Sequence, residues 1–252
     1  MSNGKKITVI IAIAFFIALI ASLYTLFSIR KVSARYEVYG SSGETAEIQQ
    51  ALNEFKGKNM LFFDIGEVRE RLEGFSYYEV IAVEKEYPNV INVSLKKRTE
   101  TFAVTVGDKT YVLDGEGVVL NDSGETFTES SVTGVTTSGI TAEEVVLGEL
   151  IRTSDDALFY SALDMAKKAA LSDFVASVEI ISDIEIKDVV LNTRTGVKIT
   201  VYKADVRGVA KIEKVLDAFE NASDYTKTYS EIVVYMTDAG EIKVDWINGR
   251  TQ

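Results

Sequence analysis

The sequence predicts an α+β chain that begins with one membrane-spanning helix and continues into two domains. Three observations support this fold class. Residues 7–29 form an uncharged apolar run. Residues 33–98 show the periodicities of strand, helix, helix, strand and strand in that order, and residues 99–248 alternate β-branched runs with two amphipathic helices. The expected architecture is therefore a transmembrane helix, a small β-α-α-β-β domain and a mixed β domain with helices.

Residues 7–29 predict a transmembrane helix because they carry no charged side chain and would span about 34 Å at the rise of an α-helix, enough for a hydrocarbon core of about 30 Å. A cleaved signal peptide is disfavoured because the apolar run is too long and leads directly into Arg30-Lys31. A buried core helix is disfavoured because the run has no polar side.

The flanking charges do not settle the orientation of this helix. Lys5 and Lys6 precede it, whereas Arg30, Lys31 and Arg35 follow it, contrary to a simple positive-inside count. Long domains translocate largely regardless of flanking charge, and residues 1–6 are too short to be the working part. We therefore expect a single-pass protein of the cell membrane that contacts the lipid bilayer through residues 7–29. Its N-terminus is expected to be cytoplasmic and residues 32–252 extracytoplasmic.

Residues 33–98 predict a complete small domain. Polar and apolar side chains alternate in three runs, as in strands, and apolar side chains recur at helical spacing in two others. The elements expected are a strand at 33–39, a helix at 44–55, a short helix with Asp64 as its N-cap, and strands at 78–87 and 90–98. The last two strands meet at Pro88-Asn89 and form a hairpin.

Residues 99–248 predict a second domain of strands with two helices, followed by a short tail at residues 249–252. The expected strands are at 102–106, 110–113, 118–120, 175–186, 189–192, 197–202, 232–236 and 241–246, and the expected helices at 157–174 and 210–221. Residues 121–139 are rich in Ser, Thr and Gly with little hydrophobic periodicity, so we expect a loop there.

Composition excludes several classes of function. The chain contains no Cys and no His, which excludes disulfides, thiolate nucleophiles, imidazole bases and Cys/His zinc sites. The formal net charge is −11, and all 38 acidic side chains follow Lys31. Such an acidic body repels phosphate backbones, so we expect no nucleic-acid partner.

The carboxylates of the second domain offer weak candidates for chemistry. Asp114 and Glu116 could form the carboxylate pair of a cell-wall hydrolase, but the flanking glycines predict a hairpin turn. Asp155 and Asp156 lack the spacing of a calcium loop and are expected to cap a helix. Lys96-Lys97-Arg98 either meets an anionic partner or ends a strand in solvent. We therefore expect no catalytic, cofactor-binding or metal-binding residue and no small-molecule substrate.

The order of features resembles the FtsQ/DivIB family of bacterial cell-division proteins, which have a short cytoplasmic tail, one anchor, a POTRA domain and a β domain. Four segments are similar to motifs of that family: residues 36–40 (YEVYG), 57–62 (GKNMLF), 83–93 (VEKEYPNVINV) and 111–118 (YVLDGEGV). The resemblance implies that residues 33–98 are a POTRA domain and that residues 99–248 are the β domain.

The resemblance also implies a function. Members of the family perform no chemistry; they bind single-pass division proteins of the FtsB/DivIC and FtsL types at the septum and help regulate septal peptidoglycan synthesis. The family's contact adds a partner strand to the last strand of the β domain. In this chain that strand is residues 232–236 or its hairpin mate at 241–246. The implied binding residues are Ile232, Val233, Val234, Tyr235, Met236 and Trp246.

Some alternatives remain open at the level of sequence. Trp246 is as well explained by packing on the sheet as by a partner contact, and Tyr235 fits a core position slightly better. A POTRA-bearing chaperone or translocation module would instead capture extended segments on residues 78–87. A membrane-anchored wall hydrolase that uses only carboxylates is a third alternative.

Overall fold

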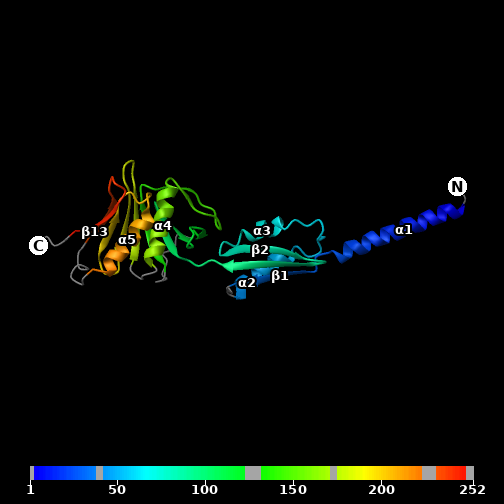
Figure 1. Cartoon of the computed structure of the whole chain (residues 1–252). Helices are drawn as coiled ribbons and strands as arrows, with labels where there is room; N and C mark the ends of the chain where they lie inside the picture. The colour runs from blue at the N-terminus through cyan, green and yellow to red at the C-terminus, as the bar shows by residue number, and fades with distance from the viewer. Residues whose placement is uncertain (1–2, 38–41, 123–131, 171–174, 223–230, 248–252) are drawn as a thin grey trace. The chain divides into compact units, whose positions relative to one another are not determined.

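The computed structural model (Figure 1) describes residues 3–37, 42–122, 132–170, 175–222 and 231–247. Parts of the expected strand at 33–39, loop at 121–139 and helix at 157–174 fall outside the described residues, as does the tail at 249–252. The chain divides into two compact units, Met1–Arg98 and Thr99–Gln252. The α+β fold class is confirmed by the order of helices and strands in both units.

The first helix, α1, spans Asn3–Leu26, and its segment Ile7–Leu26 is long and apolar enough to cross a bilayer. The helix ends three residues before the predicted boundary at Ile29. The reason is that Ile29 is only 1% exposed and belongs to the core of the following domain. An apolar side chain in a domain core and one in a membrane span look alike in the sequence.

The rest of the first unit has the predicted order of strand, helix, helix, strand and strand. The elements are β1 (Lys31–Tyr36), α2 (Ser42–Asn53), α3 (Gly66–Leu72), β2 (Tyr78–Glu86) and β3 (Val90–Lys97). Their sheet has the order β1-β3-β2, with β1 parallel and β2 antiparallel to the central β3. Ile48 and Leu52 of α2, together with Val68 and Leu72 of α3, pack into a core with the buried side chains of the sheet.

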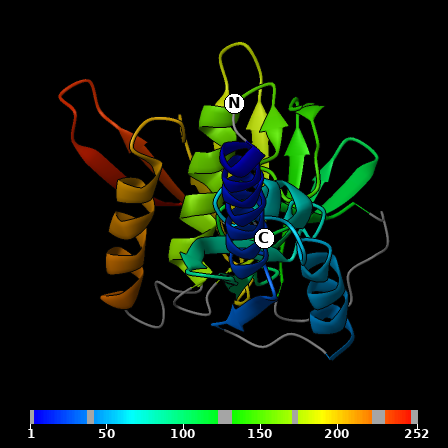
Figure 2. The same cartoon turned by 90° about the vertical axis from the view of Figure 1, so that its right-hand side faces the viewer.

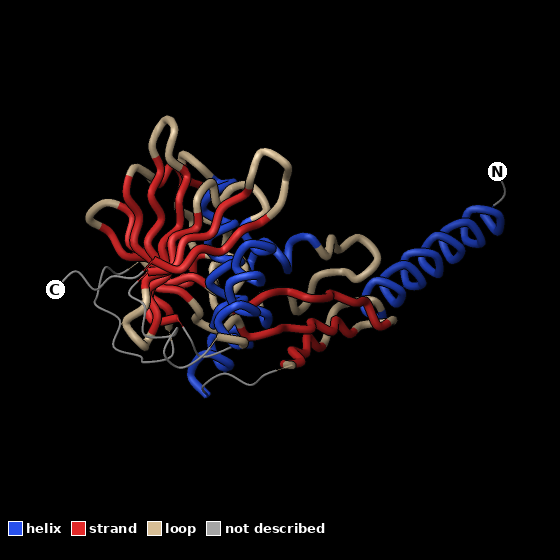
Figure 3. Tube along the Cα trace, turned by 60° about the vertical axis from the view of Figure 1, so that its left-hand side comes forward, coloured by secondary structure: helices blue, strands red, loops and turns tan. Residues whose placement is uncertain are grey.

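The second unit is built on a nine-stranded sheet with two helices. The strands are β4 (Phe102–Val106), β5 (Lys109–Leu113), β6 (Val119–Asn121), β7 (Thr133–Ser138), β10 (Val175–Ser182), β11 (Lys187–Thr193), β12 (Lys198–Val201), β13 (Glu231–Met236) and β14 (Ile242–Ile247). Their order is β14-β13-β12-β11-β10-β7-β4-β5-β6. A separate pair is formed by β8 (Ala142–Glu144) and β9 (Arg152–Thr153). The strands of the large sheet are drawn in red at the left of Figure 3.

Two helices cover one face of this sheet. Helix α4 (Asp156–Ala170) contacts β10, and α5 (Gly208–Glu220) contacts β12, β13 and β14. They lie side by side, and Figure 2 shows the β13–β14 hairpin in red beyond α5. Phe159 of α4 and Ile212 of α5 are fully buried against the sheet. The helices therefore seal the core behind the hairpin that ends the sheet.

The expectation of a loop throughout residues 121–139 is wrong for its last part. Strand β7 lies in the middle of the sheet, parallel to both β4 and β10. Its buried Val135 is flanked by Thr and Gly, so the hydrophobic alternation is too weak to predict a strand. The following Gly139 has a φ of +77°, and a Cβ there would lie 1.8 Å from the carbonyl oxygen of Ser182. Glycine therefore permits the close approach of β7 and β10 where they end.

Candidate partner-binding edge

The last hairpin places β14, and not β13, at the end of the large sheet. Strand β13 pairs with β12 on one side and with β14 on the other. The expectation that residues 232–236 could accept an added strand is therefore wrong, because both sides of β13 are occupied. Residues 241–246, the other expected strand, correspond to β14. In the described part of the chain no strand pairs with the outer side of β14.

The opposite end of the sheet is covered by the chain itself. Strand β6 pairs with β5, and on its other side the N–H of Val119 donates to the carbonyl oxygen of Glu149 at 2.9 Å. The N–H of Gly148 in turn donates to the carbonyl oxygen of Val119 at 2.8 Å. Covering an edge in this way prevents pairing with another chain. Of the two ends of the sheet, β14 is therefore the better placed to receive a partner.

The hydrogen-bond pattern shows which groups of β14 point outward. The N–H of Thr237 donates to the carbonyl oxygen of Glu241 at 2.9 Å, so these two residues form a hydrogen-bonded pair. Such pairs alternate along an antiparallel ladder, so the backbone groups of every second residue of β14, beginning with Lys243, face β13. The bond on the other side of β13 is consistent with this pattern. The N–H of Tyr202 donates to the carbonyl oxygen of Val234 at 3.0 Å, so the backbone of Val234 faces β12 and that of the next residue faces β14. It follows that the backbone N–H and C=O groups of Ile242 and Val244 point away from the sheet.

The helix-facing side of β14 is anchored in the core. Ile242, Val244 and Trp246 are partly buried and pack against the hydrophobic core of the second unit. The ring of Trp246 stacks on that of Phe219 from α5, with 6.1 Å between centroids and 16° between planes. The structure therefore directs Trp246 toward α5, and its side chain helps to fix β14. A direct contact between Trp246 and a partner stays a prediction.

The other face of the hairpin is polar and accessible. The hydroxyl of Tyr235 donates to Oδ2 of Asp245 at 2.9 Å, and this hydrogen bond raises the pKa of Tyr235. Lys243 and Asp245 are exposed on β14, and Met236 of β13 is also exposed. Of the predicted binding residues, Ile232, Val233 and Val234 are buried. Only Tyr235, Met236 and part of Trp246 can present a side chain to a partner.

A buried lysine that the sequence analysis did not single out lines a pocket beside the same hairpin. Lys211 of α5 is 1% exposed, and its Nζ donates to the carbonyl oxygens of Tyr202 and Lys203 at 2.7 Å each. Burial lowers the pKa of this lysine. Together with Tyr235 and Gly240 it lines a pocket of about 340 Å³. The sequence does contain a signal for this burial, because Lys211 lies four residues before Val215 and so falls on the apolar stripe of α5.

The edge of the small sheet is less open. Strand β2 lies at one end of that sheet, but its pairing with β3 shifts between Val80 and Ala82. At this irregularity Nη1 of Arg69 donates to the carbonyl oxygen of Val80 at 3.1 Å. A bulge and a side chain on the edge both hinder the addition of a further strand.

The acidic residues considered for chemistry have structural roles. Oδ1 of Asp114 accepts hydrogen bonds from the N–H groups of Glu116 and Val118, each at 2.9 Å, and so closes the expected turn. Oδ1 of Asp155 accepts the N–H of Leu158 at the start of α4, as expected of a cap, and Asp156 accepts the N–H of Thr153. In the described residues no three acidic groups gather where they could hold a metal ion.

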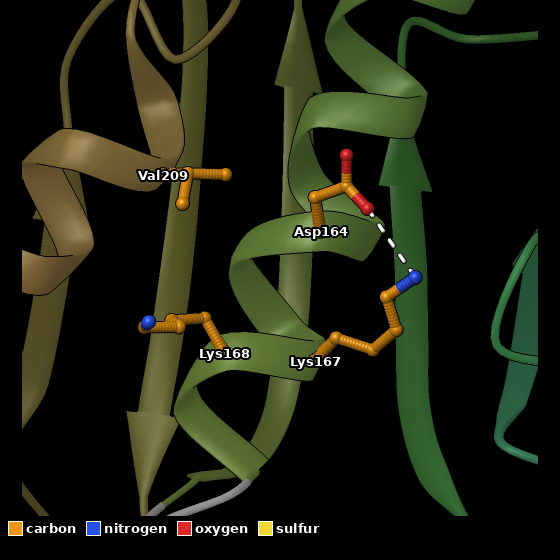
Figure 4. Close-up of a pocket in the computed structure, with 4 residues that line it drawn as sticks. All are labelled: Asp164, Lys167, Lys168 and Val209. Carbon is orange, nitrogen blue, oxygen red and sulfur yellow. Dashed lines mark ion pairs between the residues drawn. The ribbon is translucent and has the colours of Figure 1, made fainter.

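A second hollow lies between α4 and α5 and is lined by Asp164, Lys167, Lys168 and Val209 (Figure 4). Its charged groups form ion pairs at the surface. Nζ of Lys167 lies 3.5 Å from Asp164, and Nζ of Lys168 lies 2.8 Å from Glu213. Figure 4 shows the two lysine side chains extending in different directions. The hollow does not gather groups on one point, as a catalytic site would.

Comparison with known proteins now identifies the first domain. Residues 42–98 match the family model of the POTRA domain, FtsQ-type. A search of curated proteins gives no significant match to the chain. The matched residues cover α2, α3, β2 and β3. Residues 42–98 are therefore a POTRA domain of the FtsQ type, and this domain together with the apolar helix α1 before it is consistent with the FtsQ/DivIB cell-division family.

Proposed function

We propose that this protein is a bitopic cell-division scaffold whose extracytoplasmic part binds single-pass proteins of the FtsB/DivIC and FtsL types. Through them it helps to regulate septal peptidoglycan synthesis. The observation that carries the proposal is the FtsQ-type POTRA domain that directly follows an anchor-length apolar helix. In this proposal α1 crosses the membrane once, and both following domains lie outside the cytoplasm.

The proposed contact is the addition of a partner strand to β14. Its support is the outward orientation of the Ile242 and Val244 backbone groups, together with the closed state of the opposite edge at β6. Strand addition draws affinity from main-chain hydrogen bonds and specificity from side chains on alternate positions. Lys243 and Asp245 point to one face of the edge and suit a partner strand with charges of both signs.

The two alternatives have weaker support. A chaperone-like POTRA domain would use the edge of β2, where the bulge and Arg69 already interfere. A carboxylate-only hydrolase would need two carboxyl groups about 5–10 Å apart with the pKa of one raised by its surroundings. Asp114, its best candidate, is engaged by two backbone N–H groups. We therefore propose a protein that is not an enzyme.

Fluorescence microscopy of the tagged full-length chain in dividing cells tests the proposal. We expect a band at the division site, because a divisome scaffold is held there by its partners. A tagged segment that contains only residues 1–31 serves as the control and should stain the whole membrane evenly. Even staining by the full-length chain would contradict a role in division.

A further inference from the structure

The chain passes from α1 into the POTRA domain without a spacer. Leu26 is the last residue of the helix, yet Ile29 and Val32 are already 1% and 3% exposed in the domain core. A flexible linker would hold no such buried residues. The domain must therefore begin within a few residues of the end of the membrane span.

Two turns of the POTRA domain are bonded to this short connection. From the turn at residues 57–60, the N–H of Met60 donates to the carbonyl oxygen of Phe27 at 2.7 Å. Nδ2 of Asn59 donates to Tyr24 of α1 itself at 3.3 Å. From the β2–β3 turn, Asn89 accepts the N–H of Arg30 at 2.9 Å. Figure 1 shows this turn beside the end of α1. Because Tyr24 belongs to the apolar span, the first turn lies at the depth where that span ends.

Exposed apolar side chains directly follow the first of these turns and begin the second. Phe62 is 85% exposed, Leu61 50%, Ile65 37% and Tyr87 58%. We call these four residues the juxtamembrane patch. Tyr87 also contacts Phe27, the residue directly after α1, with 6.3 Å between ring centroids. A phenylalanine so exposed on a folded domain is unfavourable in water, and several together mark an interaction surface.

The loop that carries Leu61 and Phe62 is held in place. Nζ of Lys85 donates to the carbonyl oxygens of Met60 at 3.0 Å and Phe63 at 2.5 Å. Oδ1 of Asn59 accepts the N–H of Leu61 at 3.0 Å. Met60 and Phe63 are themselves buried in the core, so Leu61 and Phe62 are displayed between two anchored neighbours. The fold thus keeps these side chains at the surface and does not bury them.

Three exposed cations lie near the patch, together with Glu86, which is exposed directly before Tyr87 and accepts a hydrogen bond from Nδ2 of Asn92. Arg30, Lys31 and Lys56 are exposed on the same connection and turn. Lys58 forms an ion pair with Glu67, and the carboxylate of Asp64 accepts the N–H of Gly66 at 2.8 Å. Exposed cations beside apolar and aromatic side chains are the composition that proteins use at the interface between lipid headgroups and acyl chains.

We propose that the juxtamembrane patch inserts into the headgroup layer of the same bilayer that α1 crosses, so that the POTRA domain rests on the membrane. The occupant is lipid and not a protein, because Tyr87 of the patch contacts Phe27 directly after α1, and Asn59, two residues before Leu61, is bonded to Tyr24 of the apolar span. The proposal depends on α1 being a membrane anchor, and it does not depend on the partner bound at β14.

The absence of cysteine from the sequence allows a clean test with a single label. The full-length chain carrying Phe62→Cys is labelled with an environment-sensitive NBD dye and reconstituted in vesicles of phosphatidylethanolamine and phosphatidylglycerol. We expect a blue-shifted emission, quenching by lipids with a doxyl group near the headgroup, and protection from aqueous iodide. An emission typical of water with full quenching by iodide would overturn the proposal.

The matched control is Glu73→Cys, an exposed position that follows α3 in the same domain. Position 73 precedes β2, whose first residue Tyr78 pairs with Lys97 at the end of β3. The opposite end of β3, at Val90, pairs with Lys31, which follows the membrane span. At about 3.3 Å per residue, β3 puts roughly 20 Å between these ends. The dye at position 73 should therefore remain in water.

A second variant separates insertion of the patch from insertion of the dye alone. With the dye at Ile65→Cys, we expect Phe62→Asp to shift the emission toward that of water, since the charged side chain opposes insertion. Phe62 is too exposed for this change to disturb folding. An unchanged emission, or protection that occurs only when a protein partner is added, would overturn the proposal.

Discussion

Replacement of Val244 by proline should reduce retention of the division partner at least about tenfold, while the β domain stays folded. The N–H of Val244 points away from β13, so proline removes no bond of the sheet itself. Edge strands tolerate proline on their solvent-facing side. A tenfold loss corresponds to about 1.4 kcal/mol, the size of one or two main-chain hydrogen bonds. The measurement is affinity purification of the tagged full-length chain from solubilised membranes, with quantitative mass spectrometry of the small single-pass proteins retained.

Val244→Ala is the matched control for this variant. It loses similar packing against the core, since the side chain of Val244 is partly buried, but it keeps the backbone N–H. Retention with alanine and loss with proline would together identify the edge of β14 as the binding element. Equal retention of the partner by both variants would show that the partner binds elsewhere.

Replacement of Lys211 by alanine should destabilise the second unit by about 2–3 kcal/mol, which corresponds to a midpoint lower by roughly 4–12 °C. The change removes a fully buried side chain and leaves the carbonyl groups of Tyr202 and Lys203 without their present donor. These carbonyls lie in the connection between β12 and α5, where Lys203 and Arg207 adopt positive φ angles of 47° and 55°. The backbone there is strained and depends on its bonds.

Thermal unfolding can be followed through Trp246, the only tryptophan in the sequence, because its ring stacks on Phe219 of α5. Lys214→Ala is the control, since Lys214 lies on the exposed side of the same helix. The midpoint temperature of unfolding of this control should lie within a few degrees of that of the original sequence. If both variants unfold at the same temperature, the bonds from Lys211 do not stabilise the connection between β12 and α5.

The sequence was sufficient to predict a long apolar helix and the strand, helix, helix, strand and strand that follow it, because both have strong local signals. The uncharged run at residues 7–29 predicts most of α1, and the alternation around Pro88-Asn89 predicts the β2–β3 hairpin. The end of α1 was placed too late because Ile29 is equally apolar in a bilayer and in a domain core. Distinguishing these two environments requires the contacts of Ile29 with the turn at residues 57–60.

The order of strands in the large sheet could not be read from local patterns. Strands β12 and β13 pair in parallel across the intervening helix α5, and this long-range pairing moves β13 into the interior of the sheet. Strand β7 was not predicted because its threonines and Gly134 lack the hydrophobic character expected of a strand in the middle of a sheet. The last hairpin was predicted from local patterns, while the finding that β14, and not β13, ends the sheet required the structure.

Site-specific photo-crosslinking in dividing cells tests the central claim most directly. One photoreactive residue replaces Lys243, exposed on β14, and a second, in a separate strain, replaces Ile81, exposed at the bulge of β2. We expect position 243 to capture a small single-pass division protein and position 81 to capture none. If position 81 captured varied secreted chains and position 243 captured nothing, binding at β14 would be contradicted and the chaperone-like function favoured.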